Sequence, residues 1–164
     1  KEYRRQRQMC IRDSTNPHAA ASSLQAFPRA VWVVGGLLKG VDIAPLVAER
    51  GPGVKAAIVI GTLRDEVVQA FARHAPDVPV YEVVAGETED VMQRVVDQAA
   101  SIAAAGDTVL LAPAAASFDQ FSGYAERGTR FADSVRALLA GQSGTTARSG
   151  DDDPDTDAPG ERGA

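Results

Sequence analysis

Short apolar runs rich in β-branched residues recur along the central part of the chain. Apolar runs without polar alternation are typical of strands that are covered on both faces, as in parallel sheets. The third of the four runs is less pure than the others because Pro79 and Glu82 interrupt it. We therefore predict four strands, at residues 29–34, 56–60, 78–84 and 108–111.

Amphipathic helical patterns lie between these runs. Apolar residues recur at a spacing of four after Thr62, which we expect to cap that helix. A longer pattern of the same kind begins after Thr88 and ends before Gly106. Near the start of the chain, Asn16 and Pro17 suit the cap and the first position of a helix.

Two further helices complete the pattern. A short one is expected over residues 44–49, with Asp42 before it more simply a cap than an acid catalyst. The last one is expected to open at Gly128 and carries an apolar stripe along one face. Alternating strands and helices predict an α/β domain with a mostly parallel sheet flanked by helices.

The two ends of the chain differ from its centre. The whole chain has 164 residues, which is room for one domain with tails. Residues 141–164 are acidic and rich in glycine and proline, and such a segment buries too little apolar surface to offset the entropy of ordering. Residues 7–14 resemble a translated adaptor sequence. We expect a non-native or disordered leader at 1–14, a domain at 15–140 and a disordered acidic tail at 141–164.

Composition argues against several classes of protein. The 17 Lys and Arg residues against 22 Asp and Glu residues give a net charge of −5, which disfavours a nucleic-acid binder. No apolar run approaches the roughly 20 residues of a membrane-spanning helix. One cysteine, Cys10, and two histidines are too few for a disulfide framework or a Cys/His zinc site. We expect a cytoplasmic monomer without a nucleic-acid or membrane partner and without a metal site of its own.

The loop after the first strand is the first candidate site. Residues 35–42 place three glycines around Lys39, so backbone N–H groups and a mobile cation lie together. This arrangement suits a carboxylate or a phosphate. It is not a Walker loop, because the spacing differs and no Ser or Thr follows the lysine. On this loop alone, a solvated lysine on a turn explains the pattern equally well.

The loop after the fourth strand is the second candidate site. Small residues at 112–116 lead to Ser117, which lacks the glycine-flanked elbow and the triad partners of a nucleophile. A helix cap is the simplest role for Ser117, and donation to an anionic ligand is the alternative. Asp119 and Arg127 are expected to form a structural ion pair. Because ligands gather beyond the carboxyl ends of parallel strands, both loops belong to one candidate edge.

Three segments together resemble one family. Residues 15–20, residues 35–42 and the block from Ser117 to Phe131 are similar to the C-terminal domain of the Mur ligase family, in its D-glutamate-adding branch. The resemblance covers Thr15 to about Leu139. Its Ser-Phe-Asp-Gln-Phe block, at 117–121, is the most specific part, whereas the glycine–lysine block is shared more widely among these ligases.

The resemblance implies a Rossmann-like, three-layer domain of a three-domain ligase. In such enzymes ATP phosphorylates the carboxylate of UDP-N-acetylmuramoyl-L-alanine, and the amine of D-glutamate then attacks the acyl phosphate. ATP and Mg would be bound mainly by domains absent from this chain, so the chain alone is expected to be inactive. It would contribute to peptidoglycan synthesis by positioning an amine, which accelerates the reaction through proximity.

The resemblance also implies roles for individual residues, none of them catalytic. Lys39 would pair with a carboxylate of D-glutamate, and the remaining hydrogen bonds would come from Thr15, Ser117 and the backbone near Phe118 and Tyr124. Nucleotide-side or supporting positions would be Asn16, Gly36, Asp119, Gln120 and Arg127. The chain departs from the family where it lacks a lysine and an alanine before Thr15, and where Tyr124 replaces a common phenylalanine.

Two alternatives stay open on the sequence alone. The domain could belong to a sibling Mur ligase or to an enzyme resembling folylpolyglutamate synthase, although the Asp-Asn-Pro-Arg signature of the diaminopimelate-adding relatives is absent. It could also be a free-standing, non-catalytic α/β binding domain. An upstream reading frame with a P-loop would separate the ligases from this last alternative.

Overall fold

The computed structural model describes residues 8–11, 16–84, 90–117 and 119–145. Strands and helices alternate along the chain, as predicted. In order, the elements are β1 (Gln8–Ile11), α1 (Pro17–Ala26), β2 (Val31–Gly35), α2 (Ala44–Arg50), the 3-10 turn η1 (Gly51–Gly53), β3 (Ala56–Ile60), α3 (Arg64–His74), β4 (Val80–Glu82), α4 (Val91–Ile102), β5 (Thr108–Leu111) and α5 (Tyr124–Thr145).

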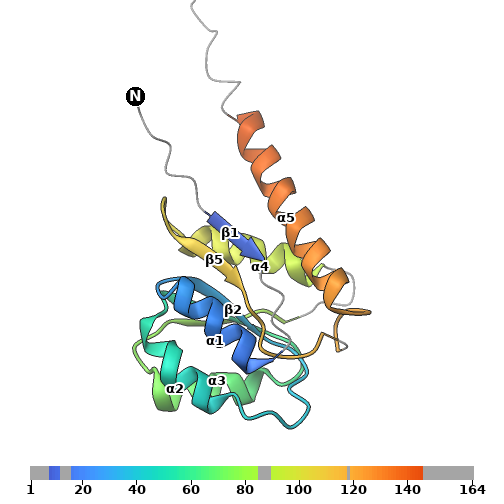
Figure 1. Cartoon of the computed structure of the whole chain (residues 1–164). Coiled ribbons are helices and arrows are strands. Elements are labelled where there is room, and N and C mark those ends of the chain that lie inside the picture. Colours follow the sequence, from blue (N-terminus) through green and yellow to red (C-terminus); the bar gives the residue numbers. More distant parts are fainter. Residues whose placement is uncertain (1–7, 12–15, 85–89, 118, 146–164) are drawn as a thin grey trace, which may run out of the picture.

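The strands form one parallel sheet in the order β1-β5-β2-β3-β4 (Figure 1). Central β2 pairs with β3 on one side and with β5 on the other, so that Val33 lies opposite both Ile58 and Leu111. From β2 the chain adds β3 and then β4 on one side, and it then crosses over to place β5 on the other side of β2. The strand order therefore reverses between β2 and β5. Such a reversal opens a crevice at the carboxyl ends of the neighbouring strands. The predicted parallel sheet is confirmed.

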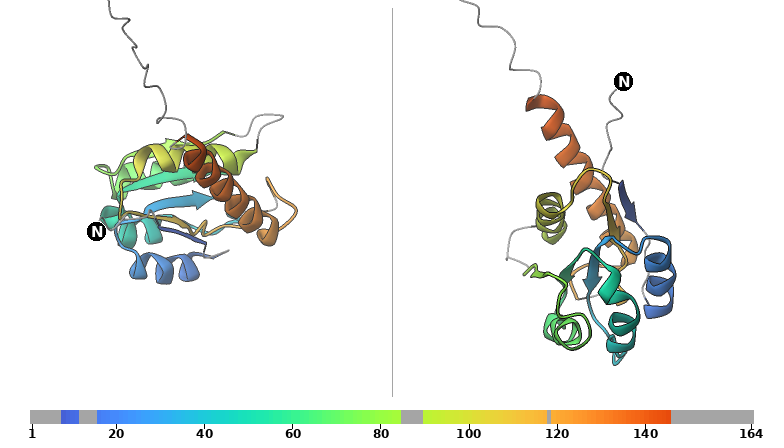
Figure 2. Two further views of the ribbon diagram at one scale, coloured as in Figure 1. Left: turned by 90° about the horizontal axis from the view of Figure 1, so that it is seen from above. Right: turned by 90° about the vertical axis from the view of Figure 1, so that its left-hand side faces the viewer.

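Helices cover both faces of the sheet (Figure 2). One face, with Trp32 and Val34 of β2, packs on buried residues of α1, α2 and α3. The other face, with Val31 and Val33, packs on α4 and on Phe131 of α5. Successive side chains of a strand point to opposite faces, so an uninterrupted apolar strand serves two cores at once. The three-layer α/β architecture is therefore confirmed.

Some predicted helix starts are right and others are wrong. Asn16 caps α1, and its side chain accepts a hydrogen bond of 2.9 Å from the Ala19 amide. Thr62 does not cap α3, which begins at Arg64 without a side-chain cap. The last helix begins at Tyr124, one turn earlier than the predicted start at Gly128.

The ends of the fold also differ from the prediction. Residues Gln8–Ile11, placed in the predicted leader, form the edge strand β1, and all four pair in register with β5. The edge of β5 offers these four residues hydrogen-bond partners. Helix α5 continues to Thr145, beyond the predicted boundary at residue 140. The other residues of the predicted leader and tail lie outside the described ranges, and their assignment stays a prediction.

Candidate functional site

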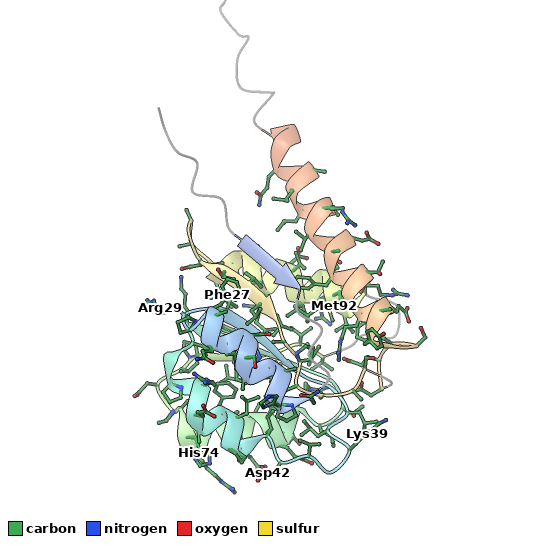
Figure 3. The ribbon with its side chains drawn as sticks, viewed as in Figure 1. Phe27, Arg29, Lys39, Asp42, His74 and Met92 are labelled. Carbon is green, nitrogen blue, oxygen red and sulfur yellow. The ribbon has the colours of Figure 1, made fainter. Side chains whose placement is uncertain are left out.

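The loops that follow β2, β3 and β5 meet at the carboxyl edge of the sheet. Lys39 lies at this edge, and Arg29, which precedes β2, lies at the opposite edge (Figure 3). Lys39 is exposed and has a φ of 50°, which is unusual for a residue with a side chain. The backbone turn that follows is closed by a hydrogen bond of 2.9 Å from the Val41 amide to the Leu38 carbonyl.

A short antiparallel bridge joins the loop after β2 to the loop after β5. The Leu37 amide donates to the Ala116 carbonyl at 2.9 Å, and the Ala116 amide donates to the Leu37 carbonyl at 3.1 Å. One step earlier, the Gly35 amide donates to the Pro113 carbonyl at 2.9 Å. The two candidate loops of the sequence, 35–42 and 112–121, are therefore fastened side by side.

Gly36 occupies the point where these two loops approach most closely. Its φ of 135° is open only to glycine, and a Cβ atom there would lie 2.5 Å from the Ala116 carbonyl oxygen. Any side chain at this position would force the bridge apart. Glycine at position 36 thus allows the two loops to touch.

Ser117 directly follows the bridge and is 2% exposed. Its carbonyl accepts hydrogen bonds from the amides of Gln120 and Phe121, at 3.2 and 2.9 Å. These bonds form a tight turn rather than the start of a helix, so the simple cap interpretation of Ser117 is wrong. Gln120 is half-buried in this turn.

Asp119 ties this turn to the loop after β3. Its Oδ2 atom accepts from the Thr62 amide at 2.9 Å and from the Thr62 hydroxyl at 3.3 Å. Its other oxygen, Oδ1, is buried and has no hydrogen-bond donor within the described ranges. Thr62 therefore contacts Asp119, and the residue directly before α3 is Leu63, which makes no side-chain cap bond.

Arg127 does not pair with Asp119, so the predicted ion pair is wrong. The guanidinium of Arg127 is buried, with 1% of the residue exposed, and its Nη1 atom donates to the Ala115 carbonyl at 3.1 Å. Asp119 is turned instead toward Thr62. Both residues therefore hold the loop after β5, but each holds it from a different side.

Tyr124 is 60% exposed at the first turn of α5, and Asn16 is exposed at the cap of α1. Thr15 and Phe118, the other two predicted site residues, lie outside the described residues.

A carboxylate that the sequence pattern did not single out fixes the start of α5. Glu126 accepts hydrogen bonds from the Ser122 amide at 2.7 Å and the Ser122 hydroxyl at 2.6 Å, and from Arg130 at 2.8 Å. The bonds from Ser122, followed by the bond and charge of Arg130, lower the pKa of Glu126 to about 2. Arg130 in turn reaches Asp90, which caps α4. The sequence signal for this contact is a serine and a glutamate four residues apart, just before an apolar stripe.

Within the part of the chain that the structure describes, no group of three His, Cys, Asp or Glu side chains could hold a metal ion. The helices of that part include none with the length and apolar character needed to span a membrane. At this edge the exposed Lys39 and the buried Ser117 lie on two loops that are fastened to each other. This is a set of donors suited to a small anion.

Comparison with known proteins identifies relatives of this chain. No family model matches the chain. Proteins named UDP-N-acetylmuramoylalanine–D-glutamate ligase match it well: that of Leifsonia xyli is 56% identical over 128 residues, or 78% of this chain. Those of Mycobacterium avium and Mycobacterium leprae are 46% and 47% identical, each over 77% of the chain. The chain spans only 25–31% of the length of these relatives. By this similarity the chain belongs to the Mur ligase family, in which it corresponds to the C-terminal domain of the D-glutamate-adding ligases.

Proposed function

We propose that this chain is the D-glutamate-binding portion of an ATP-dependent ligase that joins D-glutamate to UDP-N-acetylmuramoyl-L-alanine in peptidoglycan synthesis. The observation that carries the proposal is the bridge between Leu37 and Ala116, because it fastens the loop of Lys39 to the loop of Ser117. The relatives named for this reaction share the same stretch of sequence at 46–56% identity.

The chemistry of the ligand matches the donors at this edge. D-Glutamate carries two carboxylates, and a lysine ammonium forms strong, charge-assisted hydrogen bonds with such groups. Lys39 pairs with one carboxylate, while Ser117 and the backbone of Phe118 and Tyr124 supply hydrogen bonds, together with Thr15. Asn16, Gly36, Asp119, Gln120 and Arg127 support these positions or face the nucleotide.

The role of this chain in the reaction is to position the amine of D-glutamate. A phosphorylated carboxylate of the second substrate is attacked by that amine, and phosphate leaves as the amide forms. Holding the two reactants together makes the step effectively unimolecular, which accelerates it without acid–base chemistry from this domain. ATP and Mg are bound mainly by the other portions of the ligase. The ligase works in the cytoplasm as a monomer.

The proposal is tested by titrating the isotope-labelled chain with D-glutamate and following its amide NMR signals. We expect the signals of residues 36–40 and 116–121 to shift with D-glutamate and much less with L-glutamate. Lys39→Ala should abolish the shifts. Arg29→Ala, which removes an exposed cation from the opposite edge, is the matched control and should leave them unchanged.

A second measurement uses the complete ligase, with the upstream part of the reading frame restored. Lys39→Ala should raise the KM for D-glutamate far more than the KM for ATP, because the lysine contacts only the amino acid. An unchanged KM and kcat for D-glutamate in that variant, or equal responses to D-glutamate and L-glutamate in the chain, would refute the assignment of the pocket.

A further inference from the structure

A buried arginine, Arg127, lies against the loop that follows β5. Arg127 is 1% exposed, whereas Arg130 and Arg136 on the same helix have side chains that are 48% and 73% exposed. Arginine is rarely buried to this degree, because removing its charge from water is costly unless its donors are satisfied. A buried arginine beside a binding edge therefore calls for a specific role.

One contact of Arg127 is with the backbone of the loop after β5. Its Nη1 atom donates to the Ala115 carbonyl at 3.1 Å. Ala115 is followed at once by Ala116, which pairs with Leu37, and then by Ser117. A hydrogen bond from a charged donor is stronger than one between neutral groups, and the planar guanidinium fixes its direction.

The backbone just before Ala115 has an unusual conformation that neighbouring groups must stabilise. Ala114 has a φ of 59° and is buried, and a residue with a side chain adopts that conformation only when its surroundings impose it. The Ala115 carbonyl belongs to the second peptide unit after Ala114, so a bond to it restrains the backbone that leaves this conformation. A bond from Arg127 to this carbonyl therefore stabilises the unusual conformation and fixes the direction in which the chain leaves it.

We propose that Arg127 is a positioning residue, which holds the Ala115 carbonyl and so keeps the loop of Ser117 closed against the loop of Lys39. The residue does not touch the ligand; it acts through the bridge between Leu37 and Ala116. This inference rests on the proposed function for its consequence in D-glutamate binding, but the effect on the bridge itself does not depend on any ligand.

The first test is ligand-free and uses hydrogen exchange of the whole chain. The amides of Leu37 and Ala116 donate across the bridge, and the amides of β2 and β5 report global unfolding. In Arg127→Met, exchange at the two bridge amides should rise by about tenfold beyond any change in the strands, since a charged hydrogen bond is lost. Arg136→Met removes an exposed arginine from the same helix and should leave both groups of amides unchanged.

The second test measures D-glutamate affinity in the same variants by NMR titration. The dissociation constant should rise about tenfold in Arg127→Met, by less in Arg127→Lys, and not at all in Arg136→Met. Arg127→Lys keeps a charge at this position and provides the measurement if Arg127→Met does not fold. A dissociation constant that is partly restored by lysine indicates a directed hydrogen bond, because a side chain that only filled space would not give this difference between lysine and methionine.

The outcomes separate the two proposals. Bridge amides that change only in proportion to the strand amides would overturn the positioning role, whatever the ligand does. A looser bridge with an unchanged dissociation constant would also overturn it, because the loop would then not set the binding geometry. If the unaltered chain gives no response to D-glutamate, the proposed function fails at the level of this chain, and the exchange result alone decides the role of Arg127.

Discussion

Gly61 offers the sharpest test of how the loops at the carboxyl edge fit together. It has a φ of 91°, and a Cβ atom there would lie 2.3 Å from the Cα atom of Gly36 and 2.9 Å from Oδ2 of Asp119. Neither neighbour is the end of a flexible side chain that could move away at little cost. The contact with Gly36 is with backbone, and the contact with Asp119 would disturb its bonds to Thr62.

The expected destabilisation by Gly61→Ala is the sum of two effects. A left-handed backbone conformation costs a residue with a Cβ atom about 1–2 kcal/mol. Overpacking against a fixed backbone adds about 1–3 kcal/mol. We therefore expect Gly61→Ala to lower the free energy of unfolding by about 2–5 kcal/mol, which is a large part of the stability of a domain of this size.

Two other glycines separate these effects. Gly40 has a φ of 77° but no atom within 4 Å of its Cβ position, so Gly40→Ala should cost only about 1–2 kcal/mol. Gly141 lies in α5 with open space around it, and Gly141→Ala should stabilise by up to about 1 kcal/mol through helix propensity.

The assay is urea unfolding followed by tryptophan fluorescence. Trp32 is the sole tryptophan and is fully buried, so its emission reports the core directly. The free energy of unfolding should rank Gly141→Ala above the unaltered chain, then Gly40→Ala, then Gly61→Ala. A Gly61→Ala variant as stable as Gly40→Ala would show that the loops do not touch as described.

Three further predictions concern single contacts. Trp32→Phe removes the hydrogen bond of 2.7 Å from Nε1 to the buried Ala112 carbonyl. We expect it to lower the free energy of unfolding by about 1–3 kcal/mol beyond the cost of lost volume, as measured by circular dichroism in urea. Equal stability of the two chains would refute this prediction. The folded-state pKa of Glu126, about 2, lies below its ordinary 4.5, so its stabilising contribution is present above pH 4.5 and is lost as the pH falls toward 2. The stability difference between the unaltered chain and Glu126→Gln should therefore shrink across that range, and a constant difference would contradict the assignment. Asp119→Ala should destabilise the chain more than Asp119→Asn, since one oxygen of Asp119 accepts both bonds from Thr62. A double-mutant cycle of Asp119→Ala with Thr62→Ala should show a coupling free energy of about 0.5–1.5 kcal/mol. A coupling free energy of zero would mean that the hydroxyl contact does not contribute to stability.

The local pattern of the sequence was enough to predict the sheet. The runs at 56–60 and 108–111 coincide with β3 and β5, because each is short, apolar and buried on both faces. The run at 78–84 is longer than β4, which covers only Val80–Glu82. This strand lies at the edge of the sheet, where Tyr81 is 37% exposed and one side has no partner strand among the described residues, so the periodicity there carries less information.

Contacts between distant segments account for the wrong predictions. Thr62 has the composition of a helix cap, but its partner is Asp119, which lies 57 residues further along the chain. Asp119 and Arg127 are close in sequence and opposite in charge, yet the fold directs them to different loops. Nothing in the local pattern around either residue reveals which loop will arrive beside it. The rule that parallel strands share a carboxyl edge was nevertheless sufficient to place the loops of Lys39 and Ser117 together.

The two edges of the sheet hold their loops by different means, and this difference bears on how Lys39 can be tested. At the amino edge, Lys55 and Asp107 form an ion pair that also ties in the Ala104 amide, so a lysine there is part of the framework. At the carboxyl edge the framework consists of the Leu37–Ala116 bridge, the Asp119–Thr62 bonds and the Arg127 contact. Lys39→Ala leaves each of those bonds in place and keeps a Cβ atom at the same left-handed φ, so the strain of the turn is the same in both chains. A loss of D-glutamate response in that variant, with the Leu37 and Ala116 amides still protected from exchange, would therefore report the ammonium group, whereas the same loss in Lys55→Ala would report the fold.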